Sequence, residues 1–177
     1  MASPRDYKNT IVPNWCPGCG DYGIQNAISA VCAKKGWANE DITLISGIGC
    51  SSRIGGYQYC YGAHTTHGRA LPFAQGIKCA NKDQHMIVCS GDGDSYAIGL
   101  GHAMHAIKRN MDITYLVFDN QVYGLTKGQT SPASDKGFVT KTTPDGNPLT
   151  PLDAPAMALA AGATFVAQAY AIDSKTM

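Results

Sequence analysis

The chain has 177 residues, a formal net charge of +1 and a hydrophobic content of 44%. A chain so close to neutral gives no electrostatic reason to expect nucleic acid or an anionic membrane surface as a partner. No apolar stretch is long enough to span a bilayer, and the N-terminal sequence has no apolar signal core. We therefore expect a cytoplasmic protein in which residues 1–177 form a single domain.

Short apolar runs alternate with helical patterns along the chain. In chain order, the predicted elements are a helix at Asp21–Lys35, a strand at Ile42–Ser46, a helix at Pro72–Asn81, a strand at Met86–Ser90, a helix at Ser95–Arg109, a strand at Ile113–Asp119, a helix at Pro151–Ala161 and a strand at Thr164–Gln168. Strands that alternate with helices predict an α/β fold, a doubly wound parallel sheet covered by helices on both faces.

Two segments fall outside this alternation. Lys127–Thr150 is polar and rich in Gly and Pro, and a loop of that length in a compact domain is usually functional. Near the end, Asp173-Ser174 is typical of the N-cap of a further helix, but the sequence stops at Met177. This pattern predicts a domain that is incomplete at its C-terminus. A naturally short subunit with a frayed tail is the alternative.

Candidate metal ligands follow two of the predicted strands. Asp92 lies between Gly91 and Gly93 just after one strand, and Asn120 comes just after the end of the next. A right-handed crossover brings the carboxyl ends of two such strands to one edge of the sheet, where ligands bind in doubly wound folds. Carboxylate and amide oxygens suit Mg²⁺, and the two glycines allow the backbone to approach a phosphate. Alone, however, a GDG sequence is commonly a simple turn.

The seven cysteines fall into two groups. In a reducing compartment they are not a disulfide framework. Cys32, Cys79 and Cys89 lie in apolar or mixed runs and are predicted to be small buried residues, whereas Cys60 has no evident partner. Three others lie in Gly-rich turns and are candidate thiolate ligands: Cys16, Cys19 and Cys50. They suit Zn²⁺, with His64 or His67 as a fourth ligand, or an iron–sulfur cluster.

The spacing of the metal-site motifs resembles the thiamin diphosphate motif, which begins with GDG and ends in Asn. Here residues 94–118 separate GDG from Asp119-Asn120. In that family the Asp, the Asn and a backbone carbonyl two residues later hold the metal. The resemblance therefore implies thiamin diphosphate and Mg²⁺ as cofactors and a thiamin-diphosphate-binding fold. The implied metal ligands are Asp92, Asn120 and Val122.

Longer motifs resemble the β subunits of 2-oxoacid:ferredoxin oxidoreductases. They are WCPGCG, GIGCSSR, HGRALPFAQGIK, GDGDSYAIG and DNQVYGLTKGQTSP, in the order of that family and over nearly the whole chain. The resemblance implies that Cys16, Cys19 and Cys50 bind one [4Fe–4S] cluster. A cysteine in the C-terminal part supplies the family's fourth ligand, and no cysteine follows Cys89 here.

The same resemblance implies further site residues. Those expected to contact thiamin diphosphate are Ile48, Gly49, Cys50, Ser51, His67, Gly93, Asp94, Gly124 and Leu125. A bulky side chain at Leu125 can hold the cofactor bent, although ordinary core packing also explains it. Lys127 and Arg53 are candidates for the substrate carboxylate or for coenzyme A phosphates, and a solvated surface charge is the alternative for each.

Thiamin catalysis also needs a glutamate beside the pyrimidine ring. The single glutamate, Glu40, precedes a strand and so lies at the wrong edge of the sheet. In the family an α subunit supplies this residue. We therefore expect oxidative decarboxylation of a 2-oxoacid, 2-oxoglutarate before pyruvate, with an α subunit, coenzyme A and ferredoxin as partners. The alternatives are a non-redox thiamin enzyme with a zinc site and a non-catalytic binding subunit.

Overall fold

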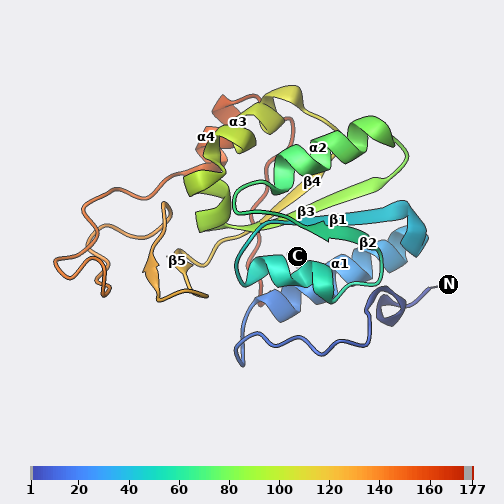
Figure 1. The fold of residues 1–177 in the computed structure, drawn as a ribbon, viewed down its shortest axis with the longest axis horizontal. Helices are drawn as coiled ribbons and strands as arrows, with labels where there is room; N and C mark the ends of the chain where they lie inside the picture. Colours follow the sequence, from blue (N-terminus) through green and yellow to red (C-terminus); the bar gives the residue numbers. More distant parts are fainter. Residues whose placement is uncertain (1, 174–176) are drawn as a thin grey trace.

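A four-stranded parallel sheet forms the centre of the computed structural model, which describes residues 2–173 and residue 177 (Figure 1). Its strands are β1 (Ile42–Ser46), β2 (Tyr61–His64), β3 (His85–Gly91) and β4 (Thr114–Phe118). They lie in the order β2-β1-β3-β4, and all three pairings are parallel. This arrangement confirms the predicted α/β class and places the carboxyl ends of the strands at one edge.

Helices cover both faces of the sheet (Figure 1). On one face lies α1 (Asp21–Lys35), and on the other lie α2 (Ala70–Ala80) and α3 (Leu100–Arg109). A short helix, α4 (Ala154–Ala160), lies beyond α3. None of the helices in the described part of the chain is long and apolar enough to cross a membrane.

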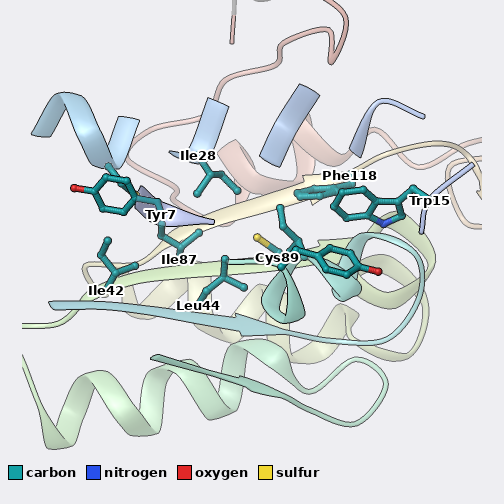
Figure 2. Close-up of a cluster of buried hydrophobic side chains, with 11 residues drawn as sticks. Tyr7, Trp15, Ile28, Ile42, Leu44, Ile87, Cys89 and Phe118 are labelled. Atoms are coloured by element: carbon teal, nitrogen blue, oxygen red, sulfur yellow. The ribbon is translucent and has the colours of Figure 1, made fainter. Parts of the chain in front are cut away.

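Each face of the sheet has its own hydrophobic core. Successive side chains of a strand point to opposite faces, so Leu44 packs toward α1 and Ile45 toward α2. Figure 2 shows the cluster on the α1 face, which contains Tyr7, Trp15, Ile28, Cys32, Ile42, Leu44, Ile54, Tyr57, Ile87, Cys89 and Phe118. Burial on both faces explains why β1 reads as a continuous apolar run rather than an alternating one.

Most of the predicted helices form, with shifted boundaries. Asp21–Lys35 is confirmed, and it ends where Gly36 adopts a left-handed conformation with φ of 68°. The helix predicted at Pro72–Asn81 begins two residues earlier, at Ala70. The helix predicted at Pro151–Ala161 begins at Ala154, because the Asp153 carboxylate caps it by accepting the N–H of Ala156 at 2.9 Å.

The continuous helix predicted at Ser95–Arg109 is wrong in its first part. Residues Asp94–Ile98 form a π-helical turn, and α3 starts only at Leu100. Side-chain bonds account for the wider turn, since the hydroxyl of Ser95 accepts a hydrogen bond from Tyr115 at 2.6 Å and Asp94 is bonded to the loops after β1 and β2. Such π-helical turns are frequent at functional sites.

The strand predicted at Thr164–Gln168 is also wrong. The segment pairs with no strand in the described part of the chain, and Phe165 is 84% exposed. An apolar run becomes a strand only when a neighbour satisfies its backbone. The helix predicted to start at Asp173-Ser174 lies outside the described residues, except for Asp173 itself.

Several short elements have no apolar periodicity and were not predicted. β2 is four residues long and mostly exposed. β5 (Val122–Tyr123) and β6 (Gln129–Thr130) form an antiparallel pair of two residues each, so part of the predicted loop at Lys127–Thr150 is a strand. Short 3₁₀ helices occur at Pro4–Tyr7, Asn39–Asp41 and Ser51–Gly56.

The structure corrects one of the predicted buried cysteines. Cys32 and Cys89 lie in the core, with 2% and 0% of their surface exposed. Cys79 is exposed, because it lies near the end of α2 on the side turned away from the sheet. Cys60 is partly buried against the α1-face core.

Candidate functional site

The loops that follow the parallel strands line a crevice with a volume of about 2090 Å³. It also extends along β4 and between the helices. Most of the predicted site residues line this crevice: Cys16, Cys19, Ile48, Gly49, Cys50, Ser51, His67, Gly91, Asp92, Gly93, Asp94, Asn120, Val122, Gly124 and Leu125. The expected meeting of strand ends at one edge is therefore present in the fold.

Asp92 is a buried carboxylate at the centre of this edge. It is 1% exposed, and the hydroxyl of Ser131 donates a hydrogen bond to its Oδ2. Burial raises the pKa of the Asp92 carboxyl, and the nearby Asp119 charge raises it further against the opposing effect of Ser131. Within the described part of the chain, no lysine or arginine pairs with Asp92. A buried carboxylate without a basic partner suits a bound cation.

Asn120 and Val122 lie on a tight turn after β4. The Oδ1 of Asn120 accepts the N–H of Val122 at 3.2 Å, which folds the side chain back over the turn. Between them Gln121 has a φ of 60°, an uncommon conformation for a residue other than Gly. The hydroxyl of Ser134 donates to the Gln121 carbonyl and secures the turn. A carboxylate, an amide and a backbone carbonyl at one edge fit the oxygen ligands of Mg²⁺.

Asp94 ties together the loops that follow three strands. Its Oδ1 accepts the N–H of Ile48 at 3.1 Å and of Gly68 at 2.7 Å, and it also contacts Nδ1 of His67. Its Oδ2 accepts the hydroxyl of Ser90. The carboxylate is thus used by protein groups. If Asp94 contacts thiamin diphosphate, as the sequence predicts, its backbone is the part available for the contact. That contact stays a prediction.

The three candidate thiolate ligands lie on two loops that contact each other. The indole N–H of Trp15 donates to the carbonyl of Cys50 at 2.7 Å and docks the CxxC turn against it. Burial raises the pKa of both the Cys19 and Cys50 thiols, and the nearby Asp21 charge and the other thiols add to the shift. These mutual effects place Cys16, Cys19 and Cys50 in one neighbourhood at the crevice.

The fit of these thiols to a metal depends on the kind of centre. Among the described residues, no three His, Cys, Asp or Glu side chains are grouped closely enough to hold a single metal ion. A [4Fe–4S] cluster instead takes one thiolate on each iron, so its ligands are more widely spaced. The histidines considered for zinc are engaged elsewhere: Nδ1 of His64 lies 3.0 Å from the Ser46 hydroxyl, and His67 contacts Asp94. The thiols therefore form no single-ion site among the described residues, and the cluster site stays a prediction.

The positions of four further residues from the sequence analysis are also clear in the structure. Arg53 and Lys127 do not line the crevice in the described structure. The guanidinium of Arg53 donates to Asn14 Oδ1 at 2.7 Å, and Lys127 is exposed. Leu125 lines the crevice and is 48% exposed, so it is not an ordinary core residue. Glu40 precedes β1, at the sheet edge opposite the crevice, as the sequence predicts.

Sequence reasoning missed three residues that shape the site. Ser131 bonds Asp92 from 39 positions away, and Tyr123 donates to the Gly93 carbonyl at 3.1 Å. Asp21 is a buried carboxylate beside Cys19 and Cys50. Asp21 could have been noticed because it follows the CxxC motif closely. Ser131 lies within the long polar loop, and no sequence pattern there indicates that it contacts Asp92.

Comparison with known proteins agrees with this geometry. Residues 47–176 match the family described as thiamine pyrophosphate enzyme, C-terminal TPP binding domain. The chain is 47% identical over 169 residues to the 2-oxoglutarate oxidoreductase subunit KorB of Mycobacterium tuberculosis, covering 96% of this chain and 45% of that protein. It is 46% identical over 164 residues to the 2-oxoacid:ferredoxin oxidoreductase subunit beta of Saccharolobus solfataricus, covering 92% and 54%.

A solved structure shows the same fold. It is the 2-oxoglutarate:ferredoxin oxidoreductase from Magnetococcus marinus with 2-oxoglutarate, coenzyme A and succinyl-CoA bound. The TM-score is 0.97 at 44% identity, over 98% of this chain and 60% of that one. The chain thus spans roughly half the length of these relatives. Because the family match covers more than half of the chain, the protein belongs to the thiamine pyrophosphate enzymes and contains their C-terminal TPP-binding domain.

Proposed function

We propose that the chain is the cofactor-binding part of a 2-oxoacid:ferredoxin oxidoreductase β subunit. The reaction is oxidative decarboxylation of a 2-oxoacid to acyl-CoA and CO₂, with electrons passed through a [4Fe–4S] cluster to ferredoxin. The observation that carries the proposal is that the loop of Cys50 and Ser51 lies against Gly91, the neighbour of Asp92, since a Cβ at Gly91 would lie 3.2 Å from the Ser51 hydroxyl oxygen. Asp92, Asn120 and the cysteines Cys16, Cys19 and Cys50 also border the same extended hollow. The names of the similar proteins support 2-oxoglutarate as the first substrate. Pyruvate is the second candidate, from the sequence resemblance alone.

In this proposal the protein binds and orients the cofactor. Thiamin diphosphate, when bound, supplies the nucleophilic carbon and the electron sink for decarboxylation. Asp92, Asn120 and the Val122 carbonyl would hold Mg²⁺, and Gly91 and Gly93 let the backbone approach the diphosphate. The exposed Leu125 side chain is available to support the cofactor from below. Ile48, Gly49, Ser51 and Gly124 complete the proposed cofactor contacts.

The cysteine group would hold the electron acceptor. A [4Fe–4S] cluster supplies one-electron redox chemistry beside the crevice when it is bound. Trp15 holds the Cys50 loop against the CxxC turn, so the three thiols stay together on one wall. Cys16, Cys19 and Cys50 are therefore the proposed ligands, and the fourth is not among the cysteines of this chain.

The proposal requires partner proteins. Glu40, the single glutamate of the given sequence, lies at the opposite end of the strands, and we propose that an α subunit supplies the catalytic glutamate. Ferredoxin takes the electrons, and coenzyme A takes the acyl group. Lys127 and Arg53 remain candidates for the substrate carboxylate or for coenzyme A phosphates. We place the reaction in the cytoplasm, where free thiols such as these seven persist.

The test is an anaerobic assay of the assembled αβ complex. Each 2-oxoacid is supplied with coenzyme A, thiamin diphosphate and Mg²⁺, and reduction of a redox dye is followed. We expect reduction that depends on coenzyme A, faster with 2-oxoglutarate than with pyruvate. Decarboxylation without dye reduction would instead indicate a non-redox thiamin enzyme. Failure to bind thiamin diphosphate with Mg²⁺ would indicate a non-catalytic subunit.

A further inference from the structure

Residues 131–134 link the two halves of the proposed Mg²⁺ site. The hydroxyl of Ser131 donates a hydrogen bond to Oδ2 of Asp92, which follows β3. The hydroxyl of Ser134 donates to the carbonyl of Gln121, in the turn that follows β4. Asp92 and this turn come from different strands, so the short segment ties one proposed group of metal ligands to the other.

The surroundings of the Ser131 hydroxyl direct its proton toward Asp92. The hydroxyl oxygen accepts the N–H of Ala133 at 3.2 Å, and the neighbouring Ser134 hydroxyl donates to Gln121 instead. Ser131 is 6% exposed and Asp92 is 1% exposed, so little water reaches the contact. A carboxylate that binds a metal ion is ionised and can only accept hydrogen bonds. Ser131 is therefore the donor of the pair.

Contacts elsewhere in the protein hold Ser131 in place. Its N–H donates to the Ser134 hydroxyl at 2.8 Å, and the side-chain amide of Asn147 donates to the Ser134 carbonyl at 3.0 Å. The N–H of Leu152 donates to the carbonyl of Pro132 at 2.9 Å. The segment also follows β6 directly, which pairs with β5. The Ser131 hydroxyl is thus anchored independently of the carboxylate that it contacts.

The two carboxylate oxygens of Asp92 therefore have different surroundings. Oδ2 accepts the Ser131 hydroxyl, whereas no side chain of residues 2–173 or residue 177 donates to Oδ1. With Oδ2 engaged, the carboxylate offers an ion one oxygen rather than two. Mg²⁺ takes single oxygens in a near-ideal octahedron, whereas the larger Ca²⁺ takes more ligands and accepts both oxygens of one carboxylate.

We propose that Ser131 is a positioning residue that makes Asp92 a one-oxygen ligand and so favours Mg²⁺ over Ca²⁺. The proposal rests on the proposed Mg²⁺ site, and it assigns the choice of ion to a side chain that does not touch the ion. Without the hydroxyl, Oδ2 becomes free and the carboxylate can turn. Mg²⁺ then loses a fixed ligand, while Ca²⁺ can use both oxygens. Loss of such an outer partner commonly costs about 10–100-fold in metal affinity.

The test compares the binding of thiamin diphosphate to the assembled complex with each ion in turn. Calorimetry gives the Kd of the cofactor at saturating magnesium chloride and, separately, at saturating calcium chloride. The wild-type complex should bind more tightly with Mg²⁺. In Ser131→Ala we expect the Kd with Mg²⁺ to rise roughly tenfold and the Kd with Ca²⁺ to change by less than about threefold.

A second pair of variants isolates the hydroxyl from the shape of the side chain. Threonine and valine have nearly the same shape, but only threonine carries a hydroxyl. Ser131→Thr should keep the wild-type ratio of the two Kd values within about threefold. Ser131→Val should shift the ratio as Ser131→Ala does. If Ser131→Ala does not fold, the comparison of the threonine and valine variants decides the matter.

Two matched controls lie in the same loop. Ser134→Ala removes the hydroxyl that bonds Gln121 and the N–H of Ser131, so it loosens the segment without freeing Oδ2 of Asp92. It should weaken binding with the two ions to the same extent. Thr142→Ala removes an exposed hydroxyl and should change neither Kd.

The ratio of the two Kd values separates a positioning role from a merely structural one. Equal losses with the two ions in Ser131→Ala would overturn the proposal, and so would unchanged constants or equal ratios in the threonine and valine variants. An equally large shift of the ratio in Ser134→Ala, or a wild-type complex without preference for Mg²⁺, would also contradict it. Failure of the proposed function looks different, because the wild-type complex would then bind thiamin diphosphate with neither ion.

Discussion

The hydroxyl of Tyr123 donates a hydrogen bond to the Gly93 carbonyl at 3.1 Å, and its ring occupies the space beside the Gly93 Cα. A Cβ at position 93 would lie 2.2 Å from Cε1 of Tyr123. Tyr123 belongs to β5, together with the proposed metal ligand Val122. The size of residue 93 therefore controls where β5 lies relative to Asp92.

Gly93→Ala is expected to weaken cofactor binding. The added methyl group must push the Tyr123 ring and with it the turn that carries Asn120 and Val122. We expect the affinity for thiamin diphosphate with Mg²⁺ to fall roughly tenfold, measured by calorimetry on the assembled complex. Gly76→Ala on α2 is the control, since a Cβ there meets nothing within 4 Å. Equal affinities in the two variants would show that this close contact is unimportant.

Asp92→Ala and Asn120→Ala are each expected to abolish the Mg²⁺-dependent part of cofactor binding. Both residues are proposed to bind the ion that bridges the protein and the diphosphate. Calorimetry with and without Mg²⁺ separates this part from binding of the cofactor alone. Asp83→Ala, which removes an exposed carboxylate before β3, is the control. Near-normal affinity in either variant would exclude that residue as a ligand.

The sequence predicted the site best where it depends on a general rule of parallel sheets, namely that the carboxyl ends of neighbouring strands meet. Asp92 and Asn120 could be predicted to meet because each follows a buried parallel strand, and both line the same crevice. Thr164–Gln168 has the composition of a strand but lacks a paired neighbour, which composition does not reveal. The helical pattern of Ser95–Arg109 likewise did not reveal the π-helical turn at Asp94–Ile98. Hydrogen bonds to residues distant in the sequence produce that turn, and a local pattern does not contain them.

The polar contacts of the site were much less predictable. Ser131 reaches Asp92 across 39 positions, and Asp94 bonds Ile48 across 46. Nothing in the spacing of these residues predicts which loops touch. The resemblance to a family supplied a list of cofactor contacts, but it did not reveal that the Asp94 carboxylate is used by His67 and two backbone N–H groups.

Cys50→Ala is expected to remove the visible chromophore of the anaerobically purified complex and its electron transfer. The Cys50 thiol lies beside Cys16 and Cys19, and Trp15 bonds to the Cys50 backbone, so the loop can keep its place without the thiol. Iron content and absorbance measure the effect. Cys79→Ala is the control, because Cys79 is exposed on α2. Full iron in the Cys50 variant would mean that the wrong cysteine was chosen.

Cys60 is expected to react slowly with alkylating reagents. Burial raises the pKa of its thiol to about 11, and the nearby Cys32 adds to the shift. The thiolate is the reactive form, so at pH 8 only a small fraction is available and the rate should climb as the pH rises toward 11. Cys79 is exposed and should be labelled before Cys60. Mass spectrometry after timed iodoacetamide treatment gives the order, and faster labelling of Cys60 would contradict it.

Lys78→Met is expected to destabilise the fold without changing the site. The ammonium of Lys78 donates to the carbonyls of Lys82 and Gln84, both at 2.8 Å, and pairs with Asp112 at 2.9 Å, while the residue is only 7% exposed. These bonds hold the connection between α2 and β3. Methionine keeps the length of the side chain but leaves both carbonyls without this donor. We expect a loss of about 1–3 kcal/mol in the free energy of unfolding.

The matched variant Asp112→Ala separates the hydrogen bonds from the ion pair. The Asp112 side chain is 94% exposed, so its charge is screened by water and its removal should change the urea midpoint very little. Because Lys78 bonds to the chain just before β3, far along the strand from Asp92, the affinity of folded Lys78→Met protein for thiamin diphosphate should equal that of wild type. Equal urea midpoints for the two variants would show that the carbonyl bonds add no stability.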